Sequence, residues 1–87
     1  MIAINQENLE KMFDMAMKID AKYVAITVKM KGHEKEELIV NRIENAFSKL
    51  AYYAETYDEN LVHKFADGIE ITDINYGYWL DEFEDMI

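Results

Sequence analysis

Few residues of this 87-residue sequence could act as a catalytic nucleophile. There is no cysteine, and Ser48, the single serine, falls inside a helical pattern with no nucleophile elbow around it. A hydroxyl nucleophile needs an adjacent base and a group that orients the base. A serine inside a helix usually bonds back to its own helix or faces water. We therefore expect Ser48 to play no chemical role.

The two histidines do not form a pair by spacing. His33 belongs to a predicted turn, His63 follows a predicted helix, and neither is part of an H-E-x-x-H pattern. Without cysteine, thiolate zinc and iron–sulfur sites are excluded, and so are disulfides. We expect both histidines to be polar residues near turns, with no metal site and no cofactor.

Carboxylates are abundant, but their spacing matches no catalytic or calcium-binding motif. A pair of catalytic carboxylates needs a cleft that separates their pKa values, and a chain of this length has little volume for one. The segments Asp58–Asn60 and Asp67–Asp73 lack the residue order of a calcium loop, and Gly68 and Gly77 belong to no phosphate-binding loop. The sequence therefore predicts a protein that is not an enzyme.

The charge is distributed unevenly along the chain. The formal net charge is −9, and residues 1–50 contain eight acidic and eight basic residues. The surplus lies in residues 51–87, with ten acidic residues and Lys64 as the one base. Direct binding to DNA, RNA or an anionic membrane would have to overcome this repulsion. We expect a basic protein as partner, with no direct nucleic-acid binding and no membrane association.

The acidic third of the chain also carries most of the tyrosines. Fixed carboxylates can imitate the phosphates of a duplex, and tyrosines supply anchors at interfaces. The predicted partner-binding residues are Tyr52, Tyr53, Glu55, Asp58, Glu59, Glu70, Asp73, Tyr76, Asp81, Glu82, Glu84 and Asp85. The interpretation requires these carboxylates to gather on one surface, and carboxylates dispersed over opposite sides would speak against it.

Both features have a plain structural alternative. A charged outer face keeps a small, aromatic-rich protein in solution without any partner. The aromatic residues could instead pack in the core, and this suits Tyr57 and Trp79 better than Tyr52.

The elements that would position these residues can be predicted from apolar spacing. A first helix is expected from about Gln6 to Ile19, with Asn5 as N-cap and Ile4 placed for a hydrophobic staple. Its apolar stripe consists of Leu9, Met12, Phe13 and Ala16.

A β-hairpin and a second helix follow. Residues 23–30 alternate as a strand with Val24, Ile26, Val28 and Met30 toward the core, and residues 38–40 form the returning strand after a turn at Gly32. The second helix is expected from about Arg42 to Tyr57, begun by a capping box of Asn41 and Glu44. Its apolar stripe is Ile43, Ala46, Phe47, Leu50, Ala51, Ala54 and Tyr57.

The last elements complete an α+β fold. A third strand is expected over residues 68–75. A short amphipathic helix follows it, with Trp79, Leu80, Phe83 and Met86 or Ile87 toward the core. The order is α-β-β-α-β-α in a single domain of residues 1–87. A right-handed crossover would place the third strand beside the first, and an edge pairing without the crossover is the alternative. We predict a three-stranded antiparallel sheet of order 2-1-3 with helices packed on one face.

Part of the chain resembles small uncharacterised phage or prophage proteins of Gram-positive bacteria. The resemblance is carried by Leu50–Tyr53, Tyr57–Leu61, Ile69–Ile71 and Tyr76–Gly77: a tyrosine-rich helix, an acidic turn, and a short strand that ends in an aromatic–glycine pair. In size, acidity and element order the chain is also similar to phage anti-CRISPR proteins that inhibit Cas9 by mimicking DNA. The resemblance implies no catalytic residue.

Two functional hypotheses follow. The first is a phage-type, anti-CRISPR-like inhibitor or modulator, whose acidic surface occludes a basic nucleic-acid-binding protein such as a nuclease. The alternative is a self-associating interaction module that forms a homodimer through exposed aromatics and the hairpin edge. The absence of disulfides, and an N-terminal stretch without a signal-peptide pattern, favour the cytosol, which would be that of the host for a phage protein.

Overall fold

The computed structural model describes residues 3–86, and its elements follow the predicted order. They are α1 (Gln6–Lys18), β1 (Tyr23–Met30), β2 (Glu37–Arg42), η1 (Ile43–Asn45), α2 (Ala46–Thr56), β3 (Ile69–Gly77) and η2 (Leu80–Met86). The elements α1 and α2 are α-helices, and η1 and η2 are 3₁₀-helices. No helix within the described residues is long and apolar enough to cross a bilayer.

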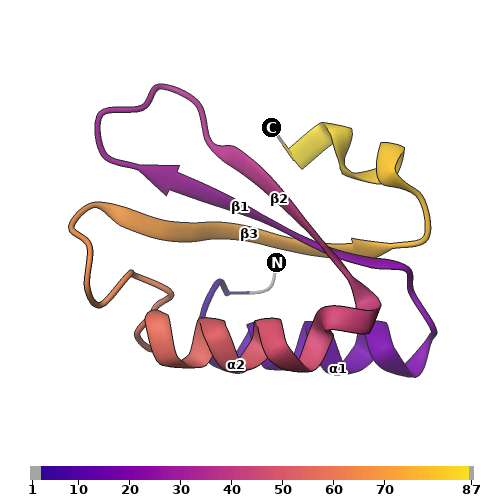
Figure 1. The fold of residues 1–87 in the computed structure, drawn as a ribbon. Coiled ribbons are helices and arrows are strands. Elements are labelled where there is room, and N and C mark those ends of the chain that lie inside the picture. Colours follow the sequence, from indigo (N-terminus) through magenta and orange to yellow (C-terminus); the bar gives the residue numbers. More distant parts are fainter. Residues whose placement is uncertain (1–2, 87) are drawn as a thin grey trace.

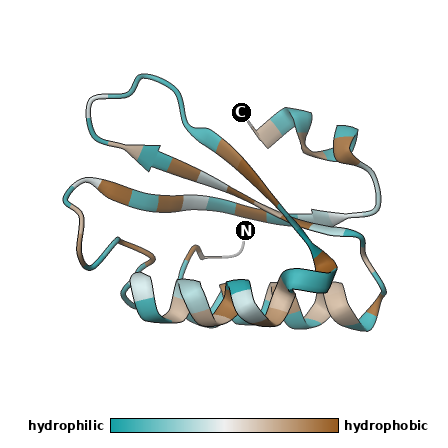
Figure 2. Ribbon diagram, in the orientation of Figure 1, coloured by the Kyte–Doolittle hydropathy of each residue, from teal (hydrophilic) through white to brown (hydrophobic). Residues whose placement is uncertain are grey.

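The sheet is antiparallel with the order β2-β1-β3, as predicted. β1 is central, and the chain crosses through α2 to place β3 on the far side of β1 from β2. Both α-helices lie side by side against one face of the sheet (Figure 1). The fold is therefore an α+β layer pair, in which apolar residues and hydrophilic residues succeed one another along the strands (Figure 2).

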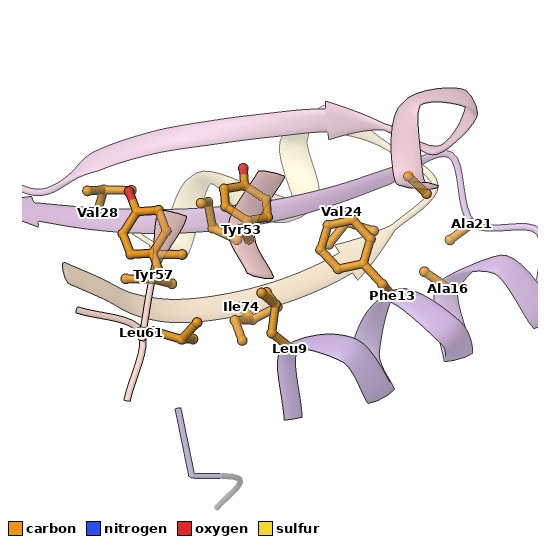
Figure 3. Packing of buried hydrophobic residues seen from close by; sticks show 13 residues of the cluster. Leu9, Phe13, Ala16, Ala21, Val24, Val28, Tyr53, Tyr57, Leu61 and Ile74 are labelled. Atoms are coloured by element: carbon orange, nitrogen blue, oxygen red, sulfur yellow. The ribbon is translucent and has the colours of Figure 1, made fainter. Parts of the chain in front are cut away.

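The core lies between this face and the two helices. Leu9 of α1 lies beside Ile74 of β3, Phe13 beside Val24 of β1, and Ala16 beside Ala21, which precedes β1 (Figure 3). The three α1 residues are all buried, which confirms the predicted stripe of that helix. Asn5 also caps α1 as predicted, because its side-chain oxygen accepts a hydrogen bond from the Asn8 backbone N–H at 2.9 Å.

The structure buries a different face of α2 from the predicted one, rotated about the helix axis by part of a turn. Ala46, Tyr53 and Tyr57 are buried, whereas Phe47 is 78% exposed and Ala51 and Ala54 are exposed. Seven apolar residues on an eleven-residue helix fit two overlapping stripes, and tertiary packing selects the one that contains Tyr53. Phe47 instead lines an open groove between α1 and α2.

The start of α2 also differs from the prediction. Residues Ile43–Asn45 form the 3₁₀-helix η1, which has no side-chain cap. Asn41, the predicted cap, is buried in β2, where its side-chain amide donates to the Val24 carbonyl at 3.3 Å and to the Tyr53 hydroxyl at 3.1 Å. A buried amide needs such partners, so Asn41 joins β2 to α2 across the core instead of capping the helix.

β3 contains a bulge that changes the side-chain alternation. Thr27 of β1 pairs with Asp73, but the next residue, Val28, pairs with Ile71, which leaves Thr72 as the extra residue. The Thr72 hydroxyl bonds the Thr27 hydroxyl at 2.9 Å. Because of the bulge, Ile71 and Ile74 both reach the core although they are three residues apart. The strand is also longer than expected, since it extends to Gly77.

The C-terminal 3₁₀-helix η2 lies on the opposite face of the sheet from α1 and α2 (Figure 1). Phe83 is its buried residue and contacts Tyr23 of β1 edge-on, with 6.3 Å between ring centroids. Trp79 and Leu80, which were expected in the core with Phe83, are exposed. Ile87, the last residue of the predicted apolar side, lies outside the described residues.

Candidate partner-binding site

The residues that could carry chemistry are engaged in local structure. The Ser48 hydroxyl donates to the Asn45 carbonyl at 3.0 Å, as expected for a serine near a helix start. His63 Nδ1 accepts the backbone N–H groups of Phe65 and Ala66, each at 3.0 Å. Within residues 3–86, no three histidine or carboxylate side chains are grouped to hold a metal ion.

A tight turn after β3 presents the C-terminal segment to solvent. Glu82 Oε2 accepts the backbone N–H groups of Tyr78 at 2.7 Å and Trp79 at 2.8 Å, and it therefore fixes the path between β3 and η2. The same carboxylate lies against Gly77, where a Cβ would approach Glu82 Oε2 to 2.5 Å. Gly77 is thus required for the close approach of this carboxylate to the backbone.

Three large apolar side chains follow one another in this turn and are exposed. The exposed fractions are 41% for Tyr78, 69% for Trp79 and 59% for Leu80. Tyr78 is held in place, because its hydroxyl donates to the Ile19 carbonyl at the end of α1, at 2.6 Å. Scattered exposed apolar residues are common, and three consecutive ones make this segment a candidate for an interaction site.

Three exposed carboxylates follow these side chains along the chain. Asp81, Glu84 and Asp85 are exposed on η2, next to Trp79 and Leu80 in the chain. We call Tyr78, Trp79, Leu80, Asp81, Glu84 and Asp85 together the C-terminal site. Glu82 is also on η2, but its role is to hold the turn.

Two acidic residues of β3 project from the same side of the sheet as η2. Glu70 pairs with Lys29, and Asp73 pairs with Thr27. Residues opposite each other on neighbouring strands share a face, and the face of Thr27 and Lys29 is opposite to that of the core residues Val24, Ile26 and Val28. Glu70 and Asp73 therefore extend the negative charge along the η2 side of the molecule.

The remaining predicted carboxylates lie on the other side. Glu55 belongs to α2, and the Glu59 backbone carbonyl accepts the Gln6 N–H at the start of α1 at 3.0 Å, so residues 55–59, which include Asp58, are part of the helix layer. Asp58 has a structural task, since its Oδ1 accepts the backbone N–H groups of Asn60 at 2.9 Å and Val62 at 3.0 Å. The structure divides the predicted acidic surface between two sides of the sheet, so the requirement that all the predicted carboxylates gather on one surface is not met.

Ion pairs leave the C-terminal site untouched. Within residues 3–86, the pairs join Glu7 to Lys11, Asp14 to Lys18 and Asp67 to Lys31, at 3.1 to 3.5 Å. None of the predicted partner-binding carboxylates of the described residues is among them. Asp58, Asp73 and Glu82 accept backbone N–H groups. The other predicted carboxylates of the described residues are available to an external cation.

The predicted tyrosines are separated by the fold. Tyr53 is 3% exposed, and burial raises the pKa of its hydroxyl above the ordinary value of 10.0. Its assignment as a partner-binding residue is therefore wrong. Tyr52 is half-exposed and stacks edge-on against Tyr53, and Tyr76 is partly buried against the core. Tyr57 is buried, as the core-packing alternative expected, whereas Trp79 is not.

Sequence reasoning missed the aromatic part of the C-terminal site. Trp79 and Leu80 were placed on the buried side of an amphipathic helix, together with Phe83. The signal that distinguishes Trp79 and Leu80 from Phe83 is Gly77, five residues before Glu82. The Glu82 carboxylate closes a turn after Gly77, and η2 therefore begins only at Leu80. Phe83 is the residue that η2 buries.

Comparison with protein-family models, with curated proteins and with solved structures finds no match for this chain.

Proposed function

We propose that the protein is an acidic binding module that docks its C-terminal site on a basic surface of another protein, of the kind that binds nucleic acid. The observation that carries this proposal is the exposure of Trp79 and of Leu80, the first residue of η2, beside η2 carboxylates that form no ion pair within residues 3–86. Occlusion of the basic surface would inhibit or modulate the partner, as the resemblance to anti-CRISPR proteins implies.

The composition of the C-terminal site suits such an interface. Tyrosine and tryptophan dominate the binding energy of protein interfaces, usually at the centre, with charged residues at the rim. The rim charges mainly accelerate encounter and select partners of opposite charge. In this arrangement Trp79 and Leu80 provide the buried contact, and Asp81, Glu84 and Asp85 provide the attraction.

The distribution of acidic residues over two sides of the sheet restricts the proposed contact surface to one of these sides. Glu55, Asp58 and Glu59 lie in the helix layer, so one flat partner surface cannot contact them together with η2. Glu70 and Asp73 are on the η2 side and can add to its electrostatic field. We therefore assign the contact to the C-terminal site and its β3 flank.

Capture from a bacterial lysate with competition by DNA tests this function. The immobilised protein is incubated with lysate at low salt, and bound proteins are eluted with a short DNA duplex. We expect the eluted partner to be a basic nucleic-acid-binding protein that is released by the duplex and by raised salt. A partner without a basic surface, or one that the duplex fails to displace, would overturn the proposal.

Two variants of equal charge provide the control. Asp81→Asn, Glu84→Gln and Asp85→Asn together neutralise the C-terminal site, whereas Glu44→Gln, Glu55→Gln and Glu59→Gln remove the same charge from η1, α2 and the turn after α2. The first variant should lose most of the captured partner, and the second should retain it. Equal losses would show that only net charge matters and that the C-terminal site is not the contact.

A further inference from the structure

The outer edge of β2 is a continuous, unpaired strand edge. β2 lies at the margin of the sheet and pairs only with β1. The Ile43 backbone N–H donates to the Lys22 carbonyl at 2.9 Å. This bond identifies Ile43 and Lys22 as a hydrogen-bonded pair, and it thereby shows which residues of β2 bond to β1. Because hydrogen-bonded and non-hydrogen-bonded pairs alternate, Ile39 and Asn41 bond inward to β1, while the backbone groups of Leu38, Val40 and Arg42 point outward.

These outward groups have no backbone partner within residues 3–86. The opposite margin of the sheet is different, because the Ile71 N–H donates to the Leu61 carbonyl at 2.9 Å and the His63 N–H to the Ile69 carbonyl at 2.8 Å. A loop thus covers the first half of β3. β2 contains no proline and no bulge, the usual protections of an exposed edge.

We propose that two copies of the chain join edge to edge through β2 and form one continuous six-stranded antiparallel sheet. The two-fold axis passes Ile39, which faces Ile39 of the partner subunit. This inference goes beyond the proposed function, since it uses the strand farthest from β3 and none of the residues of the C-terminal site.

The register follows from the side-chain pattern of β2. With Ile39 on the axis, Leu38 lies opposite Val40 of the partner subunit, and Glu36 opposite Arg42 of the partner subunit. Ile39 is 38% exposed on the helix side of the sheet, and this pairing covers it. A register centred on Val40 would instead place Leu38 opposite the partner's Arg42 and Ile39 opposite the partner's Asn41. Apolar and charge complementarity both favour the Ile39 register.

The charge distribution permits this association despite the net charge of the chain. The surplus of nine negative charges lies in residues 51–87, outside β2. Residues 1–50, which include the edge strand, have equal numbers of acidic and basic residues. Main-chain hydrogen bonds and apolar contacts between two such edges do not weaken as salt rises, in contrast to the capture of a basic partner.

Single-cysteine cross-linking tests the proposal, because the chain has no cysteine of its own. Ile39 would be in a non-hydrogen-bonded antiparallel pair, in which Cα atoms are about 4.5 Å apart, within the range of a disulfide. We expect Ile39→Cys to form a disulfide-linked dimer under mild oxidation. Glu37→Cys is the control, since two such residues would be about 14 Å apart along the strands. A dimer yield at Ile39 no higher than at Glu37, or faster cross-linking of Val40→Cys, would overturn the proposal.

Sedimentation of the wild type and a proline variant gives a second readout. The wild type should change from monomer to dimer as its concentration rises. Val40→Pro removes one outward N–H, which an edge strand tolerates, so the variant should keep its circular dichroism spectrum and remain monomeric. It should also still capture the basic partner, which separates this proposal from the proposed function. A wild type that is monomeric at all concentrations, or a Val40→Pro variant that dimerises like the wild type, would contradict the β2 interface.

Discussion

At the scale of single residues, the pair of Asn41 and Tyr53 determines how α2 sits on the sheet. Both side chains are buried, and the Asn41 amide donates to the Tyr53 hydroxyl and to the Val24 carbonyl. We predict that Tyr53→Phe lowers the free energy of unfolding by about 1–3 kcal/mol, because the Asn41 side chain loses a buried partner. Urea denaturation measures the change. Tyr52→Phe, at a half-exposed neighbour, should have almost no effect, and equal effects would contradict this role of the pair.

The buried hydroxyl of Tyr53 also makes the free energy of unfolding depend on pH in the alkaline range. Burial raises the pKa of Tyr53, and burial also raises that of Tyr57, above the ordinary value of 10.0. In the unfolded chain these hydroxyls lose their protons near pH 10, while the folded state still holds them. The unfolded state then binds fewer protons, so the free energy of unfolding falls as pH rises beyond about 10. Urea titrations across this range should show a smaller fall for Tyr53→Phe than for the wild type, and an unchanged fall would be inconsistent with the burial of this hydroxyl.

At the scale of elements, Gly77 and Glu82 together hold η2. A Cβ on residue 77 would approach Glu82 Oε2 to 2.5 Å, and this oxygen accepts two backbone N–H groups. We predict that Gly77→Ala costs about 1–3 kcal/mol of stability, as overpacking does. In the double variant with Glu82→Ala, the clash disappears, so its cost should be smaller than the sum of the two single changes. Additive costs in thermal denaturation would refute the contact.

The elements also show which parts of the fold can be predicted from sequence. α1 and the hairpin follow from local signals, the Asn5 cap and the alternation of residues 23–30, whereas the strand order follows from a general preference among connections. The face of α2 depends instead on Asn41, a polar residue whose buried partner comes from another element. The bulge at Thr72 is likewise decided by pairing with β1 and has no local signature in the chain.

At the scale of the whole molecule, the sequence predicts the net charge and the segment that carries it, but not where the charged residues lie in space. The confinement of the surplus to residues 51–87 follows from the sequence, yet the fold places Glu55 in the helix layer and Asp85 on the opposite side. The candidate site could therefore be predicted only in its acidic half. Its apolar half, Trp79 and Leu80, is exposed where Glu82 closes the turn before η2, and Phe83 is the residue that η2 buries.

The net charge also affects the stability of the whole molecule. Mutual repulsion among the surplus carboxylates opposes compaction, and salt screens this repulsion over a distance of about 10 Å at 0.1 M. We predict that the melting temperature rises when sodium chloride is added to a low-salt solution. The variant with Asp81→Asn, Glu84→Gln and Asp85→Asn should melt at a higher temperature than the wild type at low salt and respond less to salt. A lower melting temperature for this variant would indicate that these carboxylates have stabilising partners.

The most direct test of the C-terminal site uses Trp79, the only tryptophan of the chain. Protein labelled with 5-fluorotryptophan gives a single fluorine NMR resonance, which is followed while the partner isolated by capture is added. We predict that this resonance shifts and broadens in step with complex formation at low salt, and returns to its free position when high salt dissociates the complex. A complex that forms, by sedimentation, while the Trp79 resonance stays unchanged would contradict the assignment of this site.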